Sequence, residues 1–301
     1  MAERFLPLMA VDLGNTQAKL GFYPPETLVL FSLFASTVES TADMPPNTAT
    51  PTPSPPSTRQ FPAPAWIRTL RNDVPLDMEF CHSLPSSVQW VLASVNRPAA
   101  TRLINWLRLN RPNDRILMPA ATDLPIPVAL PYPDRVGIDR LIDAFAADSL
   151  RTPSRPAVIV DAGSAVTIDF LSIDGVFRGG AILPGMQMAA RAMHQFTDLL
   201  PLLEMPNSLD AMREIPVIGR STEEAMRSGL FHGTIGAIRE IATAMADAST
   251  PSVLNPAPPE IFLTGGTGEI VATLLGDFAR YDADLTLAGI SLLFLATTHR
   301  S

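Results

Sequence analysis

The chain has 301 residues, of which 47% are hydrophobic and 17% are charged, and its formal net charge of -8 gives a pI near 5.0. This acidic composition argues against a broad electrostatic surface for nucleic acid or anionic lipid. No apolar run approaches the roughly 20 residues of a membrane-spanning helix. We therefore expect neither nucleic acid nor a membrane as a partner. The single Cys81 and the lack of a signal-peptide pattern predict a cytoplasmic location.

The first informative segment is "AVDLGNTQAKLGFY" at residues 10–23, where an apolar strand runs into an Asp-x-Gly turn and a second strand. Phosphate binding needs backbone N–H groups aimed at one point, with no intruding side chain. Gly14 would leave that space, Asn15 and Thr16 would supply donors, and Lys19 would neutralise charge. Asp12 is suited to hold a Mg²⁺ ion at a nucleotide. A plain β-hairpin would use the same residues, and taken alone the segment fits either interpretation.

A proline-rich tract at residues 41–65 has few apolar side chains to bury. Its composition predicts a mobile loop or an extended spacer inserted into the first half of the chain. The following segment "WVLASVN" at residues 90–96 is a short apolar run that ends in small and polar residues, and we expect a strand there. Next, "RLIDAFAADSL" at residues 140–150 has apolar residues at helical spacing and predicts a helix.

The first motif is repeated in the second half of the chain. "IVDAGSAVTIDFL" at residues 159–171 again places an Asp-x-Gly turn between two strand-like runs, and Asp161 lies 149 positions after Asp12. Asp161 offers a second carboxylate for a metal, while Ser164 and Thr167 offer hydroxyl groups. Such a repeat predicts two similar halves that meet at a cleft and grip a phosphate chain from two sides.

A short apolar strand is predicted at residues 261–266, by its similarity to residues 90–96. The glycine-rich segment "LTGGTGE" at residues 263–269 predicts a turn at the end of this strand, followed by a helix. This turn would admit a flat ligand such as adenine, or it is a plain connector. Residues 222–248 have helical periodicity, with Ser221 or Thr222 as the cap and two acids in the first turn. Strands that alternate with helices in this way indicate an α/β architecture.

Five motifs in order, "DLGNTQAK", "GIDR", "DAGSAVTID", "GGAILPGMQ" and "STEEAMRSG", closely resemble the type III pantothenate kinases (the CoaX family). The resemblance implies a duplicated ribonuclease H-like fold of the actin/Hsp70/sugar kinase superfamily, with an ATP cleft between lobes at residues 1–149 and 150–301. It also implies phosphorylation of the 4′-hydroxyl of pantothenate by ATP, the first step of coenzyme A biosynthesis. Mg²⁺, a monovalent cation (K⁺ or NH₄⁺) and a homodimer come with the family.

The resemblance also implies roles for individual residues. Asp139 would be the general base that accepts the hydroxyl proton, and Arg140 would bind the pantothenate carboxylate in a bidentate manner. Asp161 would ligate the monovalent cation, and Asp12 would hold Mg²⁺ with ATP. The expected ATP-binding residues are Asp12, Leu13, Gly14, Asn15, Thr16, Gln17, Ala18, Lys19 and Ser164, and the expected pantothenate-binding residues are Gly137, Ile138, Asp139, Arg140, Thr222 and Tyr132.

Some features of the chain depart from the family pattern. Ser164 stands where the family usually has threonine, which keeps the hydroxyl and loses a methyl group. Tyr132 lies five residues before Gly137, whereas the spacing in the family is often seven. Residues 179–201 are expected near the pocket and the dimer contact.

Two alternatives remain: a kinase for another small hydroxylated acid, and a catalytically idle nucleotide-binding regulator of the same fold.

Overall fold

The computed structural model describes residues 5–39, 61–73, 76–153, 155–249, 258–276 and 279–298, so most of the tract at 41–65 lies outside the described residues. The chain forms two compact units. Unit 1 comprises Met1–Pro125, Val136–Ile142 and Thr286–Ser301, and unit 2 comprises Ile126–Arg135 and Asp143–Leu285. No described helix has both the length and the apolar composition required to cross a bilayer.

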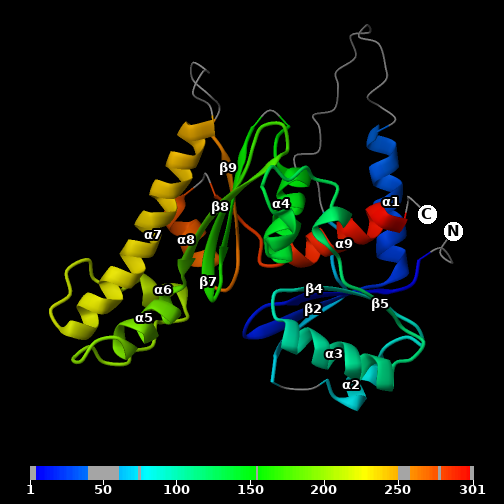
Figure 1. The fold of residues 1–301 in the computed structure, drawn as a ribbon, viewed down its shortest axis with the longest axis horizontal. Coiled ribbons are helices and arrows are strands. Elements are labelled where there is room, and N and C mark those ends of the chain that lie inside the picture. Colours follow the sequence, from blue (N-terminus) through cyan, green and yellow to red (C-terminus); the bar gives the residue numbers. More distant parts are fainter. Residues whose placement is uncertain are drawn as a thin grey trace, which may run out of the picture. The chain divides into compact units, whose positions relative to one another are not determined.

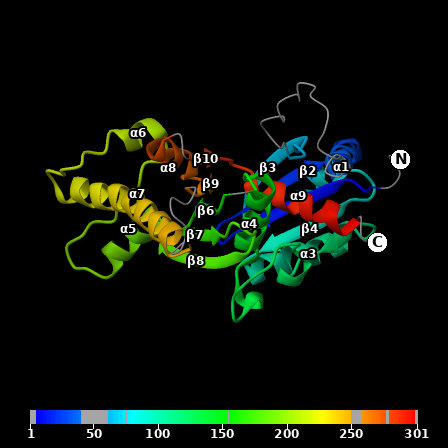
Figure 2. The same cartoon turned by 90° about the horizontal axis from the view of Figure 1, so that it is seen from above.

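Unit 1 is built on a five-stranded sheet of order β3-β2-β1-β4-β5. Its strands are β1 (Leu8–Leu13), β2 (Gln17–Tyr23), β3 (Trp66–Arg71), β4 (Gln89–Ser94) and β5 (Arg115–Leu117). The pairs β1/β2 and β2/β3 are antiparallel, whereas β4 and β5 run parallel to β1. Helices α1 (Pro25–Glu39) and α9 (Leu285–Thr298) lie on one face, and α2 (Met78–Ser83) and α3 (Arg97–Asn110) lie on the other (Figures 1 and 2).

The alternation of side chains along β1 sorts the core residues from the polar ones. Met9, Val11 and Leu13 pack in the core cluster on the face of α2 and α3. Asp12 therefore points to the opposite face, because successive side chains of a strand alternate. In the β1/β2 register Asp12 is directly opposite Lys19, so the acid and the lysine lie side by side on that face.

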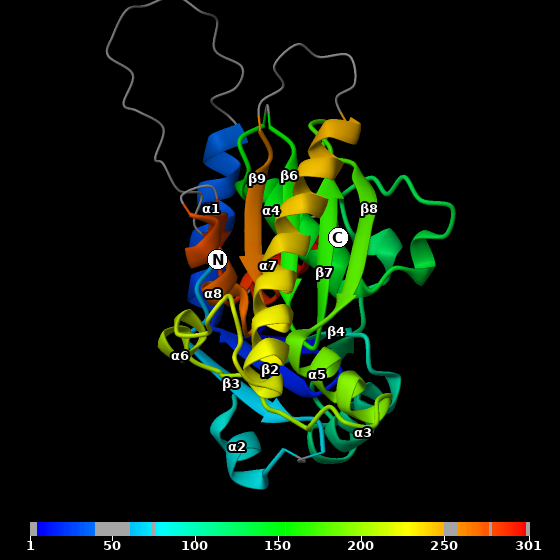
Figure 3. The same ribbon diagram turned by 90° about the vertical axis from the view of Figure 1, so that its left-hand side faces the viewer.

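Unit 2 repeats this sheet, with the order β8-β7-β6-β9-β10. Its strands are β6 (Ala157–Ala162), β7 (Ala165–Leu171), β8 (Phe177–Pro184), β9 (Glu260–Thr264) and β10 (Ala279–Tyr281). Helix α7 (Thr222–Ser249) lies across one face, and its Phe231 and Ile235 pack with Val158 and Val160 of β6 (Figure 3). Unit 2 also contains α5 (Met186–Gln195), α6 (Leu209–Arg213) and α8 (Gly268–Leu275).

The predicted duplication is confirmed, because both sheets have the same strand order and the same pattern of antiparallel and parallel pairs. This is the ribonuclease H-like topology. The hairpins differ in one respect: residues 14–16 join β1 to β2, whereas only residues 163–164 join β6 to β7.

The units do not divide at a single point in the sequence, whereas one division after residue 149 was expected. The carboxy-terminal helix α9 packs with unit 1, where a Cβ added at Gly21 would lie 3.0 Å from Leu287 and the rings of Phe5 and Phe294 are 6.2 Å apart. Sequence order does not reveal which sheet a terminal apolar helix covers. Helix α4 (Ile138–Leu150) also begins two residues earlier than the predicted 140–150, because the Leu141 amide donates to the Gly137 carbonyl.

A buried ionic network anchors the start of β4. The Asp114 carboxylate, whose side chain is fully buried, accepts hydrogen bonds from the indole of Trp90 at 2.7 Å and from the Val88 amide at 3.0 Å. The Arg111 guanidinium contacts the same carboxylate at 2.8 and 3.0 Å. Because every oxygen of this buried charge has partners, the network fixes the position of the central parallel strand.

We predict that Asp114→Ala lowers the free energy of unfolding by about 3–5 kcal/mol, because it leaves the Arg111 guanidinium without its counter-charge. Urea denaturation followed by circular dichroism measures this loss. The exposed pair of Arg71 and Asp73, 2.8 Å apart, provides the control, and Asp73→Ala should change stability little. Equal losses in the two variants would contradict the assigned role of Asp114.

Candidate active site

The turn between β1 and β2 is a closed three-residue loop. The Gly14 amide donates to the Gln17 carbonyl at 3.0 Å, which closes the turn. A Cβ added at Gly14 would meet only the Gln17 carbonyl, at an ordinary contact distance of 3.5 Å. The fold by itself therefore does not demand glycine at this position. If the residue is required, the requirement comes from a ligand that approaches the backbone closely.

Two asparagines that the motif reasoning did not single out contact this turn. Asn72 follows β3, and its side-chain amide donates to the Gly14 carbonyl at 2.8 Å. The backbone amide of Asn72 donates to the Thr16 carbonyl at 3.1 Å. The Asn96 side chain, just after β4, donates to the Asn15 carbonyl at 3.1 Å. Asn72 belongs to no motif, and Asn96 stands out in the sequence only as the end of a predicted strand. The register of four strands brings both residues to the turn.

The Gly-x-Asp-Arg segment lies at the same edge of the sheet as this turn. A Cβ added at Gly137 would be 3.4 Å from Val95, and the Val95 amide donates to the Leu13 carbonyl at 3.2 Å. The added Cβ would also be 2.6 Å from the Asp139 carboxylate, so the glycine lets that carboxylate fold back onto the helix start. Unit 1 thus brings the start of the Gly-x-Asp-Arg segment close to the end of β1, which leads into the predicted phosphate loop.

Asp139 occupies the first turn of α4 and is half-buried. Burial raises the pKa of its carboxyl group above the ordinary aspartate value of 3.8. The Arg140 amide, which donates to the carboxylate at 2.8 Å, and the Arg140 charge oppose this shift but do not cancel it. A carboxylate with a raised pKa is a stronger base, which suits the acceptance of a proton from an alcohol.

The second Asp-x-Gly turn is closed by the Gly163 amide, which donates to the Ala165 carbonyl at 3.1 Å. Asp161 is half-buried at the end of β6, where its neighbours in register are Thr167 on β7 and Thr264 on β9. Ser164 is exposed in the turn itself. A threonine thus takes the place opposite Asp161 that a lysine takes opposite Asp12.

The glycine-rich turn after β9 is attached to the end of β6. The Thr267 amide and hydroxyl both donate to the Ala162 carbonyl, at 3.1 and 2.9 Å. Gly265 has a φ of +85°, and a Cβ there would be 2.3 Å from the Asp161 carboxylate, so only glycine fits. The strand, turn and helix predicted around residues 263–269 are therefore present, and they bring the turn against Asp161.

The segment after β8 also reaches the second turn. The Gly185 amide donates to the Ser164 carbonyl at 3.1 Å, and a Cβ on Gly185 would lie 2.5 Å from that carbonyl oxygen. Part of the motif at 179–201 is therefore in direct contact with Ser164. We expect that replacement of Gly185 by any other residue is not tolerated. The added Cβ would clash with backbone oxygen atoms, which cannot move away as a flexible side chain can.

Thr222 and Tyr132 are both exposed. Of the two candidate caps of α7, Ser221 is the one used, because its hydroxyl accepts from the Glu224 amide at 3.1 Å. Thr222 is thereby left as the first helical residue with an exposed hydroxyl. The Tyr132 ring stacks under the Arg135 guanidinium at 4.6 Å.

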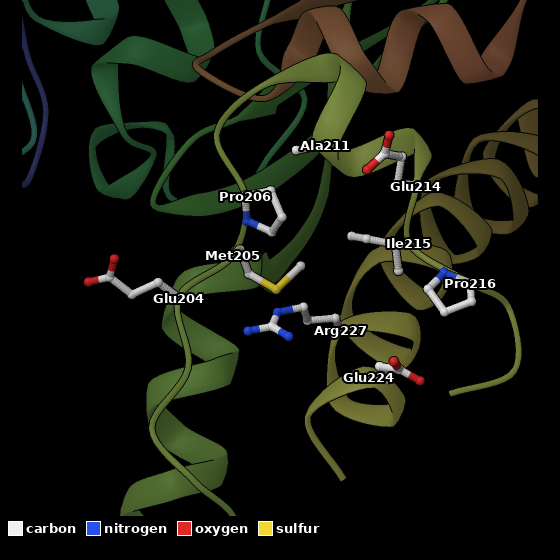
Figure 4. Close-up of a pocket in the computed structure, with 9 residues that line it drawn as sticks. All are labelled: Glu204, Met205, Pro206, Ala211, Glu214, Ile215, Pro216, Glu224 and Arg227. Atoms are coloured by element: carbon white, nitrogen blue, oxygen red, sulfur yellow. The ribbon is translucent and has the colours of Figure 1, made fainter. Parts of the chain in front are cut away.

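A hollow of about 380 Å³ lies in unit 2 between α6, α7 and residues 204–206 (Figure 4). The Arg227 side chain extends from α7 toward Met205, and it is paired with Glu223 at 3.7 Å. Three glutamates line this hollow against one arginine, and none of the predicted site residues lines it. An acidic lining of this kind does not suit a triphosphate. We therefore take the hairpin turn of each unit, rather than this hollow, as the candidate functional region of that unit.

Each unit holds one part of the predicted site: Asp12, Lys19 and residues 137–140 lie in unit 1, and Asp161, Ser164, Thr222 and Tyr132 lie in unit 2. Among the described residues no group of three or more His, Cys, Asp or Glu side chains could hold a metal ion. A cation at Asp12 or Asp161 would therefore take further ligands from substrate phosphates, backbone carbonyls or water. Mg²⁺ in nucleotide sites is commonly held in this way, by one or two carboxylates together with phosphates.

Comparison with known proteins identifies relatives of the chain. The family model described as type III pantothenate kinase matches residues 67–244. A protein from Rhodopirellula baltica named type III pantothenate kinase is 40% identical over 172 residues, which cover 56% of this chain and 61% of the relative. A protein of the same name from Nitratidesulfovibrio vulgaris is 37% identical over 188 residues, which cover 62% of this chain and 68% of the relative. The chain thus spans about two thirds or less of these relatives' length.

Among solved structures, MreB5 of Spiroplasma citri bound to ADP is 10% identical with a TM-score of 0.44, over 99% of this chain and 98% of that one. A likeness this distant says nothing about the chemistry of the chain.

The family match covers more than half of the chain. It includes the segment of Asp139 and Arg140, the second turn with Asp161 and Ser164, and Thr222, whereas Asp12 and Lys19 precede it. The first turn is linked to that region by the geometry of unit 1, through Leu13, Val95 and Gly137. The chain belongs to the type III pantothenate kinase family.

Proposed function

We propose that this protein transfers the γ-phosphoryl group of ATP to the 4′-hydroxyl of pantothenate, the first step of coenzyme A biosynthesis. The observation that supports the proposal is the nearness of Gly137, two residues before Asp139, to Val95, whose amide is hydrogen-bonded to Leu13 just before the turn, in a chain whose family is established. A kinase requires this pairing, because the base must reach the alcohol that attacks the phosphoryl group held by the turn.

In this proposal each residue of unit 1 has a separate task. The turn donates backbone amides to the phosphate chain, and Lys19 adds positive charge beside Asp12. Asp139 accepts the proton of the attacking hydroxyl late in the transfer. Arg140 binds the pantothenate carboxylate with its two-pronged guanidinium, which fixes the distance between carboxylate and hydroxyl.

The two cations expected for the family have chemically suitable residues. Asp12, the second-last residue of β1, would hold Mg²⁺ together with ATP phosphates, and the ion would neutralise charge on the transferred group. Asp161, packed against Gly265, would ligate K⁺ or NH₄⁺. Ser164 would contact ATP, and Thr222 and Tyr132 would contact pantothenate. A cytoplasmic location remains a prediction.

A homodimer forms part of the proposal. Large apolar side chains of unit 2 are exposed in the segment after α5 and before α7: Phe196 (80%), Leu199 (87%), Leu202 (61%), Val217 (74%) and Ile218 (81%). Apolar surface of this amount on one part of a protein is typical of an interaction site. A second copy of the chain is the occupant that the family resemblance implies.

A coupled assay of ADP release tests the proposed reaction. With ATP, Mg²⁺, pantothenate and K⁺ or NH₄⁺ we predict turnover, and Asp139→Asn should lower kcat by about 10²- to 10⁴-fold, because the proton acceptor is lost. Lys19→Met serves as a companion variant, which should weaken the interaction of the enzyme with ATP and not with pantothenate. Turnover only with other hydroxylated acids would favour a different acceptor, and ATP binding without turnover would favour a regulator.

The raised pKa of Asp139 predicts a pH dependence of opposite sign for activity and stability. Activity should fall as the pH drops toward the raised pKa, at a pH above the ordinary 3.8 of aspartate, because the base becomes protonated. The carboxylate, in contrast, destabilises the folded state above that pKa, since burial disfavours its charged form. Asp139→Asn should therefore melt at the same or a higher temperature than the wild type at pH 7, and this difference should vanish near pH 3.8. A less stable Asn variant at pH 7 would contradict the assigned burial cost.

Double substitution of Phe196 and Leu199 by glutamate tests the dimer. Charged side chains at a shared apolar surface oppose association, so we predict a monomer by light scattering, with the fold retained in circular dichroism. The substitution Ile173→Glu, at a residue of unit 2 that is 54% exposed and lies outside this segment, is the control and should leave the dimer intact. A wild-type protein that is monomeric at micromolar concentration would contradict the proposal.

A further inference from the structure

The carbonyl groups of the turn at residues 14–16 are held by two asparagines. The side-chain amides of Asn72 and Asn96 donate to the carbonyls of Gly14 and Asn15, at 2.8 and 3.1 Å. We propose that Asn72 and Asn96 are positioning residues for the phosphoryl donor, which orient the amides of Asn15 and Thr16 toward the phosphates. This inference rests on the proposed function, because it assigns the turn to ATP.

The orientation follows from the geometry of the peptide bond. In a planar trans peptide the C=O of one residue and the N–H of the next point in opposite directions. When Asn72 fixes the Gly14 carbonyl, it also fixes the direction of the Asn15 amide. In the same way, the contact of Asn96 with the Asn15 carbonyl fixes the Thr16 amide. Each asparagine therefore controls one predicted phosphate donor without touching the ligand.

The sheet explains why these two residues reach the turn. Strand β3 flanks β2, and β4 flanks β1, so the residues that follow β3 and β4 lie on either side of the β1–β2 turn. The backbone amide of Asn72 makes a third hydrogen bond to the turn, to the Thr16 carbonyl at 3.1 Å. The Arg102 guanidinium donates to the backbone carbonyl of Asn72 at 3.3 Å. A turn held from both sides needs little reorganisation when a ligand binds.

Asn96 has a second task that can be separated from the first. Its side-chain oxygen accepts from the Ala99 amide at 3.1 Å and thereby caps α3, while its side-chain nitrogen reaches the turn. Serine is about as good a helix cap as asparagine, but it carries no amide arm. The variant Asn96→Ser therefore removes the contact with the turn and retains the cap.

Asn72 makes an unfavourable contribution to the free energy of folding that its structural role does not explain. Its side-chain oxygen is buried and has no hydrogen-bond partner among the residues that the structure describes. A buried acceptor without a partner opposes folding. The side chain therefore contributes little to stability while it holds the Gly14 carbonyl, which is the pattern expected of a residue that serves the site.

The test compares Asn72→Ala and Asn96→Ser with the matched control Asn110→Ala. In α3 the Asn110 side chain also donates to a backbone carbonyl, that of Trp106 at 2.8 Å, but away from the turn. The measurements are kcat, the KM values for ATP and for pantothenate, the calorimetric affinity for ADP, and the melting temperature. Loss of one amide contact should raise the KM for ATP and the Kd for ADP about fivefold to tenfold.

The proposal expects this effect in both turn variants, an unchanged KM for pantothenate, and none of these changes in Asn110→Ala. It is overturned if the turn variants bind ADP as the wild type does, if both KM values rise equally, or if the control behaves like them. The ADP measurement separates this inference from the proposed reaction. If the turn variants bind ADP more weakly than the wild type, while the wild type shows no turnover with pantothenate, the positioning role is supported and the pantothenate kinase activity is rejected.

Discussion

The parallel pairing of a hairpin strand with the next strand in the sheet is the constraint on which the site depends. Because β1 runs parallel to β4, and β6 runs parallel to β9, each hairpin turn meets the carboxyl end of a neighbouring strand at one edge of its sheet. In unit 1 this edge collects the turn at 14–16, Val95 and Gly137. In unit 2 it collects the turn at 163–164, Gly265 and Thr267. Ligands of open α/β sheets bind at such carboxyl edges.

The two copies of this arrangement have diverged in charge. In the first copy Lys19 lies opposite the aspartate, the turn has three residues, and two asparagines hold its carbonyls. In the second copy a threonine lies opposite Asp161, the turn has two residues, and a glycine with positive φ packs on the carboxylate. The first copy therefore suits an anion, and the second suits a cation.

The repeated Asp-x-Gly pattern was enough to predict the duplicated sheets, because alternating apolar residues and a glycine turn are local signals. The similarity of residues 261–266 to residues 90–96, together with the glycine-rich sequence that follows, predicted the strand, turn and helix around residues 263–269. Other features depend on contacts far apart in sequence. The packing of α9 on unit 1, the choice of Ser221 as the cap and the approach of Asn72 and Asn96 to the turn follow from register and tertiary packing. The nearness of Gly137 to Val95, at the strand end next to the first turn, likewise follows from tertiary packing and not from any spacing in the sequence.

The proposed function requires above all that the backbone amides of Asn15 and Thr16 bind phosphate. Nuclear magnetic resonance of the ¹⁵N-labelled protein during titration with ADP tests this claim most directly. The account predicts that the amide signals of Asn15 and Thr16 shift in proportion to the bound fraction, together with that of Gly14. Saturable binding of ADP that leaves these signals in place would contradict it.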